Sequence, residues 1–133
     1  MSRGLSLKTM PAALGMGICI LGLLVGDPEA DASGGSSSRE EFLKHYEEVH
    51  APLALKHLPS IKRYVRNYVV TRPGVEEPGF DCITEIWFDN MEGLQSAMHF
   101  WKSEAGQVIR DDEGIFMDRG KLVTLLVEEK ASK

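Results

Sequence analysis

The sequence predicts one α+β domain in which two amphipathic helices cover one face of a four-stranded antiparallel sheet. The chain has 133 residues, which is long enough for one hydrophobic core but not for two. Its apolar residues alternate between strand and helix periods in the order β-α-β-β-α-β. That order is the split βαβ, or ferredoxin-like, arrangement. Hydrophobic residues make up 43% of the chain, which excludes wholesale disorder.

The first expected strand is the apolar run 18–25, which is rich in Ile, Leu and Val and is bounded by Gly17 and Gly26. The fold needs this run as its fourth strand, and we therefore favour a strand here. The expected organisation is a dispensable extension over residues 1–15, a domain over 16–129 and a tail over 130–133.

The same N-terminal region supports a second interpretation. Arg3 and Lys8 precede an apolar stretch over residues 12–26, and small residues follow at 30–32, which is the outline of a secretory signal peptide. A membrane-spanning helix is disfavoured because about 20 apolar residues are needed to cross a bilayer. We expect a cytoplasmic protein without a membrane anchor if the run is a strand, and an exported one if it is a signal peptide.

The first helix is expected to open at the capping box over residues 38–41. Phe42, Tyr46 and Val49 then fall on one face at helical spacing. Pro52 lacks a backbone donor and disfavours helix in the preceding residue, so the helix is expected to end or kink there.

Two strands follow, over residues 61–71 and 80–88, as a hairpin with a long Pro- and Gly-containing loop. The second helix has an apolar stripe made of Met91, Leu94, Ala97, Met98 and Trp101. A short further helix, a solvated acidic turn at residues 111–113 and a last strand over 122–127 complete the domain.

Both helices of this arrangement cover the same face of the sheet, so the other face is left open and apolar. Such patches mark interaction surfaces. A homodimer that packs through the open sheet face is the simplest symmetric solution.

Several classes of protein are excluded by composition and motif. The net charge of −5 and the lack of a basic cluster argue against a nucleic-acid partner. No P-loop, dinucleotide-binding, zincin or α/β-hydrolase motif is present. Two cysteines and four scattered histidines lack the spacing of metal ligands, so no metal and no cofactor are expected.

His50 is the sharpest candidate for chemistry. It lies about 80° around the helix from Phe42, so it flanks the apolar face. The helix C-terminus favours the imidazolium while burial favours the neutral ring, a balance that suits a general acid or base. The alternative is a histidine that only caps loose carbonyls.

Tyr64, Arg66 and Tyr68 share one face of the second strand. A phenol near a histidine is suited to binding a carbonyl or hydroxyl oxygen of a substrate, whereas the alternative is that tyrosines are simply good strand residues.

Four segments resemble one known family: REEF at 39–42, HYEEVHAPLA at 45–54, TEIWF at 84–88 and the acidic stretch 111–116. Together they resemble the EthD family, small dimeric α+β barrel proteins, and the likeness covers about residues 16–129. The resemblance implies a dimeric α/β barrel with a pocket between the first helix and the sheet. Some members accompany cytochrome P450 ether degradation, and others belong to fungal aromatic-polyketide pathways.

The chain is also similar to muconolactone methylisomerases. By motif, their helix histidine matches His50 and their strand tyrosine matches Tyr64, which makes these two the candidate catalytic residues. Their cysteine position falls on Ile86, which has no thiol, and Cys82 lies four residues earlier on the same face. The candidate substrate-binding residues are Tyr46, Tyr68, Arg66, Ile86 and Cys82.

The resemblance implies a cofactor-free enzyme that uses histidine acid/base chemistry on a small, oxygenated, apolar or aromatic polyketide-like substrate. It would be an isomerase, cyclase, decarboxylase or oxidoreductase. The alternative is a non-catalytic accessory or ligand-binding protein that serves an oxidoreductase pathway.

Overall fold

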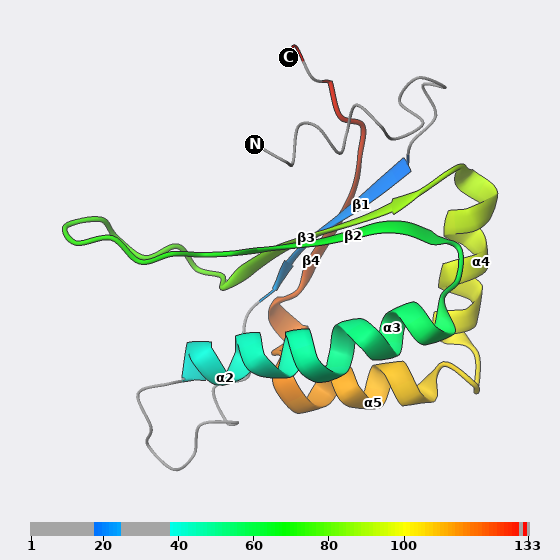
Figure 1. Ribbon diagram of the computed structural model, residues 1–133, viewed down its shortest axis with the longest axis horizontal. Helices are drawn as coiled ribbons and strands as arrows, with labels where there is room; N and C mark the ends of the chain where they lie inside the picture. Colours follow the sequence, from blue (N-terminus) through cyan, green and yellow to red (C-terminus); the bar gives the residue numbers. More distant parts are fainter. Residues whose placement is uncertain (1–17, 25–37, 131, 133) are drawn as a thin grey trace.

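The computed structural model describes residues 18–24, 38–130 and 132, and shows a sheet above a layer of helices (Figure 1). The helices α2–α3 and α5 run side by side under the sheet, and α4 descends at one end (Figure 1). In chain order the elements are β1 (Ile18–Leu24), α2 (Ser38–His45), η3 (Tyr46–His50), α3 (Ala51–His57), β2 (Ile61–Tyr68), β3 (Cys82–Phe88), α4 (Met91–Lys102), α5 (Gln107–Phe116), η4 (Arg119–Lys121) and β4 (Val123–Val127).

The sheet confirms the ferredoxin-like prediction and the first strand. Its strand order is β2-β3-β1-β4, and all three pairings are antiparallel. Gly22 in β1 lies opposite Thr84 in β3 and Thr124 in β4, so β1 is an inner strand. The predicted extension over 1–15 and the small residues at 30–32 lie outside the described residues.

The predicted end of the first helix at Pro52 is wrong. The α2, η3 and α3 segments form one continuous helix, and Pro52 stands near the start of α3. Between them η3 is a π turn, in which the amide of Ala51 donates to the carbonyl of Tyr46, five residues earlier. Pro is tolerated in the first turn of a helix, where its missing donor is not needed, and the widened turn places Pro52 in that position.

The π turn also changes which side chains face the core. Residues four apart overshoot a full α turn by about 40°, but in a π turn they fall short of it. The rotation from Tyr46 to His50 through the π turn therefore cancels the overshoot from Phe42 to Tyr46, so His50 points in nearly the same direction as Phe42. As a result His50 is buried at 4% exposure, while Val49, predicted on the apolar face, is 44% exposed.

The hairpin strands are shorter than predicted, because β2 ends at Tyr68 and β3 begins at Cys82. The connection between them extends away from the body of the domain (Figure 1). A bulge at Lys62 interrupts the pairing of β2 with β3. Beyond the bulge Tyr64, Arg66 and Tyr68 all face the helix layer, opposite Ile86, Thr84 and Cys82 respectively.

Two predictions near the second helix are also wrong. Met91 and Met98, both expected in the core, are 43% and 38% exposed. Met91 is the first residue of α4, and Met98 lines a cavity instead of packing fully into the core. The acidic residues 111–113 are not a solvated turn but belong to α5, and Asp112 is buried. Among the described residues, no helix combines the length and apolarity that crossing a membrane requires.

Candidate functional site

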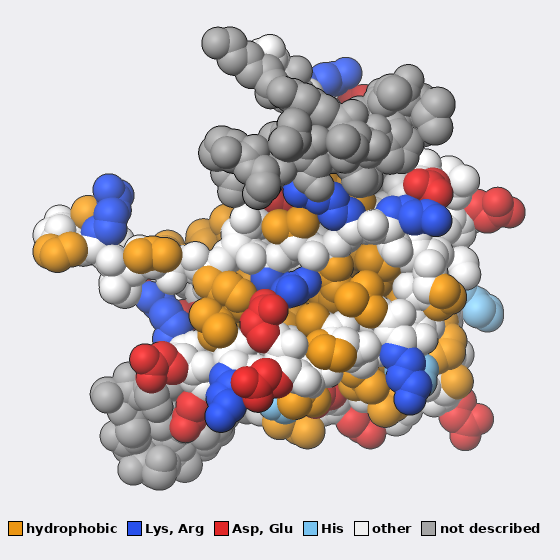
Figure 2. All heavy atoms as spheres, in the orientation of Figure 1, with side chains coloured by type: hydrophobic (Ala, Val, Ile, Leu, Met, Phe, Trp, Pro, Cys, Tyr) orange, Lys and Arg blue, Asp and Glu red, His pale blue; other side chains and the backbone are white. Residues whose placement is uncertain are grey.

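A cavity of about 220 Å³ lies between the helix layer and the sheet. Its walls come from η3 and α3, from all four strands of the sheet, and from α4 and α5. They are largely apolar and include Leu58, Ile86, Phe88 and Met98. Apolar side chains also gather on the surface between β2 and the helix layer, with charged groups around them (Figure 2). The polar groups that line the cavity are few: Tyr46, His50, Tyr64, Thr84, Glu113 and Thr124.

His50 enters this cavity with a carboxylate behind it. Its Nδ1 lies 2.8 Å from Oδ2 of Asp112, and the other oxygen of Asp112 lies 2.9 Å from Nε2 of His45. A carboxylate only accepts hydrogen bonds, so both imidazole rings donate to it. The ring of Phe116 packs on both histidines, with centroids 4.9 Å away in each case. Asp112 thereby holds His50 in one orientation, in which Nδ1 is engaged and the Nε2 atom of His50 is available to a molecule in the cavity.

Burial decides the protonation state of His50. Desolvation lowers its pKa below 6.5, although the hydrogen bond to Asp112 and the charges of Glu113 and Asp112 oppose the shift. The ring is therefore neutral at pH 7, with its proton on Nδ1 and a lone pair on Nε2. This is the tautomer that a general base requires.

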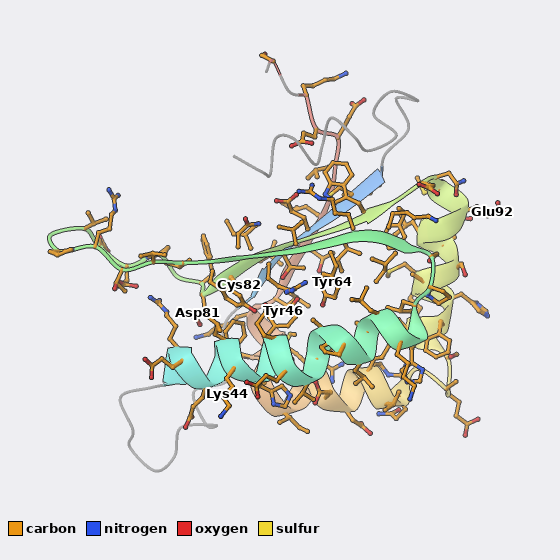
Figure 3. The ribbon with its side chains drawn as sticks, in the orientation of Figure 1. Lys44, Tyr46, Tyr64, Asp81, Cys82 and Glu92 are labelled. Atoms are coloured by element: carbon orange, nitrogen blue, oxygen red, sulfur yellow. The ribbon has the colours of Figure 1, made fainter. Side chains whose placement is uncertain are left out.

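A chain of hydroxyl groups forms another wall of the cavity. The hydroxyl of Tyr46 lies 3.0 Å from that of Tyr64 and 2.8 Å from Oγ1 of Thr84, which Cys82 contacts through sulfur at 3.6 Å. Tyr46 points up from η3 and Tyr64 points down from β2, so that the two phenols meet between the layers (Figure 3). Burial raises the pKa of Tyr64 to about 12 and that of Tyr46 well above its usual value, so both phenols stay protonated and able to donate.

Arg66 and Tyr68 stand outside this wall. Arg66 forms a bidentate pair with Glu47, at 2.8 and 3.0 Å, and Tyr68 donates to the same carboxylate at 2.6 Å. The hydrogen bonds from Arg66 and Tyr68 lower the pKa of Glu47. The guanidinium of Arg66 lies 4.9 Å from the centroid of the Tyr64 ring, so this group packs behind Tyr64.

The structure thus brings together some of the residues that the sequence singled out. His50, Tyr64, Tyr46 and Ile86 line one cavity. Tyr68, Arg66 and Cys82 are not among the residues that line it. Cys82 is buried, and burial raises the pKa of its thiol to about 11.

The sequence did not predict the roles of three residues of the site. Asp112 binds His50, and Glu113 and Trp101 line the cavity. Glu113 lines the cavity, where its Oε2 accepts a hydrogen bond from Nε1 of Trp101 at 2.8 Å. A helical pattern over 107–116 with Ile109 and Phe116 inside would have indicated that Asp112, three residues after Ile109, faces inward as well. Among the described residues no group of three His, Cys, Asp or Glu side chains is arranged to hold a metal ion.

Fold and cavity together define an α+β protein of the ferredoxin-like type, with its pocket between the helix layer and the sheet. The chain belongs to the EthD family, whose domain matches residues 36–120. No curated protein matches the sequence.

Solved structures agree on the fold. An ethyl tert-butyl ether D (EthD) family protein from Bacillus halodurans has a TM-score of 0.60 and 23% identity, and the match covers 86% of this chain and 100% of that one. An EthD-like protein from Ralstonia eutropha has a TM-score of 0.58 and 16% identity, covering 89% and 96% respectively. A dimeric ferredoxin-like protein of unknown function from Bacteroides fragilis has a TM-score of 0.55 and 9% identity, covering 85% and 96%.

Proposed function

We propose that this protein is a cofactor-free enzyme that moves a proton on a small, largely apolar, oxygenated molecule of aromatic or polyketide-like character. One observation carries the proposal: a buried, neutral histidine lines an apolar cavity with a carboxylate bound to its far nitrogen. His50 is the base, Asp112 orients it, and Tyr64 binds the substrate oxygen.

The first step uses the free nitrogen of His50. Its Nε2 accepts a proton from a carbon next to a carbonyl, or from a phenol, and the ring becomes an imidazolium. Asp112 stabilises that cation through the 2.8 Å hydrogen bond at Nδ1. A positioned base of this kind contributes about 10²–10⁴-fold to a rate.

The second contribution comes from the hydroxyl chain. When Thr84 donates to Tyr46 and Tyr46 donates to Tyr64, the proton of Tyr64 is free to point into the cavity. The phenol then donates to the oxygen on which negative charge develops. Isomerisation, cyclisation and decarboxylation all pass through such an enolate or phenolate, so this site suits each of them.

We further propose that the protein is a homodimer joined through the open sheet face. On that face β4 exposes Val123 and Leu125, each 46% exposed, on the side opposite the cavity-lining Thr124. Trp87 and Cys19 lie on the same side of the sheet but are already buried within the single chain, so the exposed apolar part of this face lies at β4. Light scattering of the dilute protein tests this proposal, and a Leu125→Lys variant is expected to shift the mass towards that of one protomer.

We also propose that the N-terminal segment is retained and that the protein is cytoplasmic. Cleavage after Ala32 would remove β1, which pairs with both β3 and β4. Mass spectrometry of the protein from its own cells tests this, because material that begins at Ser33 would contradict it.

The test of the catalytic proposal needs no native substrate. In deuterated buffer, the protein is mixed with 2-tetralone, an aromatic ketone with acidic α-protons, and deuterium incorporation is followed by NMR. Wild type is expected to accelerate the exchange, His50→Ala to abolish the acceleration, and the exposed control His99→Ala to retain it. Binding of the ketone without any exchange would instead support a non-catalytic ligand-binding protein.

A further inference from the structure

Glu113 lines the cavity, and only one of its two carboxyl oxygens has a partner. Oε2 accepts from Nε1 of Trp101 at 2.8 Å, which fixes the side chain against α4. Oε1 is buried and has no hydrogen-bond partner within the described part of the chain. The neighbouring Asp112 has both oxygens engaged by histidines, so Glu113 is the carboxyl group of the cavity that still has an acceptor to offer.

A buried hydrogen-bond acceptor without a partner, such as Oε1 of Glu113, costs free energy. A buried polar atom without a partner loses its hydration and gains nothing in return. The apolar groups nearby, such as Met98 and Ile109, supply no donor. A hydrogen-bond donor on a bound molecule would remove this cost, which makes Oε1 a recognition point for that molecule.

The position of Glu113 relates it to the rest of the site. Its charge raises the pKa of both His50 and Tyr64, which places it within electrostatic reach of the base and of the oxygen-binding phenol. A bound molecule therefore meets a donor at Tyr64, a base at His50 and an acceptor at Glu113, with apolar walls between them.

We infer that the ligand carries a hydroxyl group that donates to Oε1 of Glu113 while its carbonyl or phenolic oxygen accepts from Tyr64. This inference rests on the proposed function and specifies its substrate class: a hydroxylated aromatic carbonyl compound, rather than a plain aromatic ketone. A neutral hydroxyl suits the largely apolar walls, which offer little solvation to a charged donor. Glu113 is then a specificity-determining residue.

Equilibrium binding tests the inference. Isothermal titration calorimetry compares 2-tetralone with its isomers that carry one hydroxyl on the aromatic ring, including 6-hydroxy-2-tetralone and 7-hydroxy-2-tetralone. At least one isomer is expected to bind wild type about tenfold or more tighter than the parent, since a buried hydrogen bond to a charged group has about that effect.

Two variants identify the group responsible. Glu113→Gln keeps the size of the side chain and an acceptor for Trp101, but it replaces the free acceptor with a donor, so the preference for the hydroxyl is expected to vanish. Asp111→Asn is the control. The Asp111 carboxylate lies on the same helix but faces solvent, where it accepts a hydrogen bond from Gln107, so the preference for the hydroxyl is expected to remain. Circular dichroism checks that both variants fold.

The inference is overturned if no hydroxylated isomer binds wild type more tightly than 2-tetralone, or if Glu113→Gln keeps the preference. The readout is independent of turnover. A protein that prefers the hydroxyl but exchanges no proton refutes the proposed function alone, and one that exchanges protons without the preference refutes only this inference.

Discussion

Asp112 offers the sharpest test of the acid/base mechanism, through the substitution Asp112→Asn. The side chain is buried at 7% exposure and accepts hydrogen bonds from His50 and His45. The amide has nearly the same size but no charge, so the cavity keeps its shape. The imidazolium that forms on His50 then loses its counterion.

The magnitude follows from that hydrogen bond. A hydrogen bond to a charged group contributes about 1.5–3 kcal/mol. If this whole free energy stabilises the transition state in which His50 becomes cationic, its loss slows the exchange about 10- to 150-fold. The pKa of His50 falls further as well, because the hydrogen bond and the charge of Asp112 both raise it. The acid limb of the rate profile therefore moves to lower pH.

The assay measures deuterium incorporation into 2-tetralone in deuterated buffers over a range of pD values. His45→Gln is the matched control, since it removes the other partner of Asp112 without touching the residues that line the cavity. Its rate is expected to fall less than that of Asp112→Asn. An unchanged plateau rate together with an unmoved acid limb in Asp112→Asn would refute the reasoning.

Three further predictions concern the strand, the phenol and pH. A chain that begins at Ser33 lacks β1 and is expected to show no cooperative urea unfolding; a cooperative transition would contradict the topology. Tyr64→Phe is expected to slow the exchange about tenfold or more, because one donor to the oxyanion is lost, whereas Tyr68→Phe slows it less. Burial lowers the pKa of His50 below 6.5, so the unfolded chain binds that proton more readily and stability falls as pH drops through 6.5; urea titrations of His50→Gln should show a weaker fall, and an equal one would refute this.

Local patterns were sufficient to predict the order of strands and helices. Alternation along β2 and β3 reflects one face against the helices and one face away from them, and this pattern depends on neighbours only two residues apart. The first strand needed an additional argument, because the run 18–25 also resembled a signal peptide. The requirement for a fourth strand favoured a strand, and β1 lies between β3 and β4.

Local rules failed where the backbone departs from regular geometry. Pro52 ends an ordinary helix, but the π turn before it shifts the register and lets the helix continue to His57. The same shift turns His50 fully inward and Val49 outward. An α-helical wheel assumes a constant rotation per residue, so it placed Val49 on the apolar face and His50 only beside that face.

By itself, the sequence determined the fold class and singled out four residues that line the cavity: His50, Tyr64, Tyr46 and Ile86. His50 and Tyr64 stood out because they match the motif of muconolactone methylisomerases and lie on elements whose periodicity is visible locally. Only the tertiary structure decided that adjacent acidic residues have different partners: Asp112 faces the histidines of the first helix, while Glu113 faces Trp101 and the cavity. The reason is physical, because successive residues of a helix point about 100° apart. A helical pattern gives only the direction of each side chain, so the partner that each residue meets depends on how α5 packs against its neighbours.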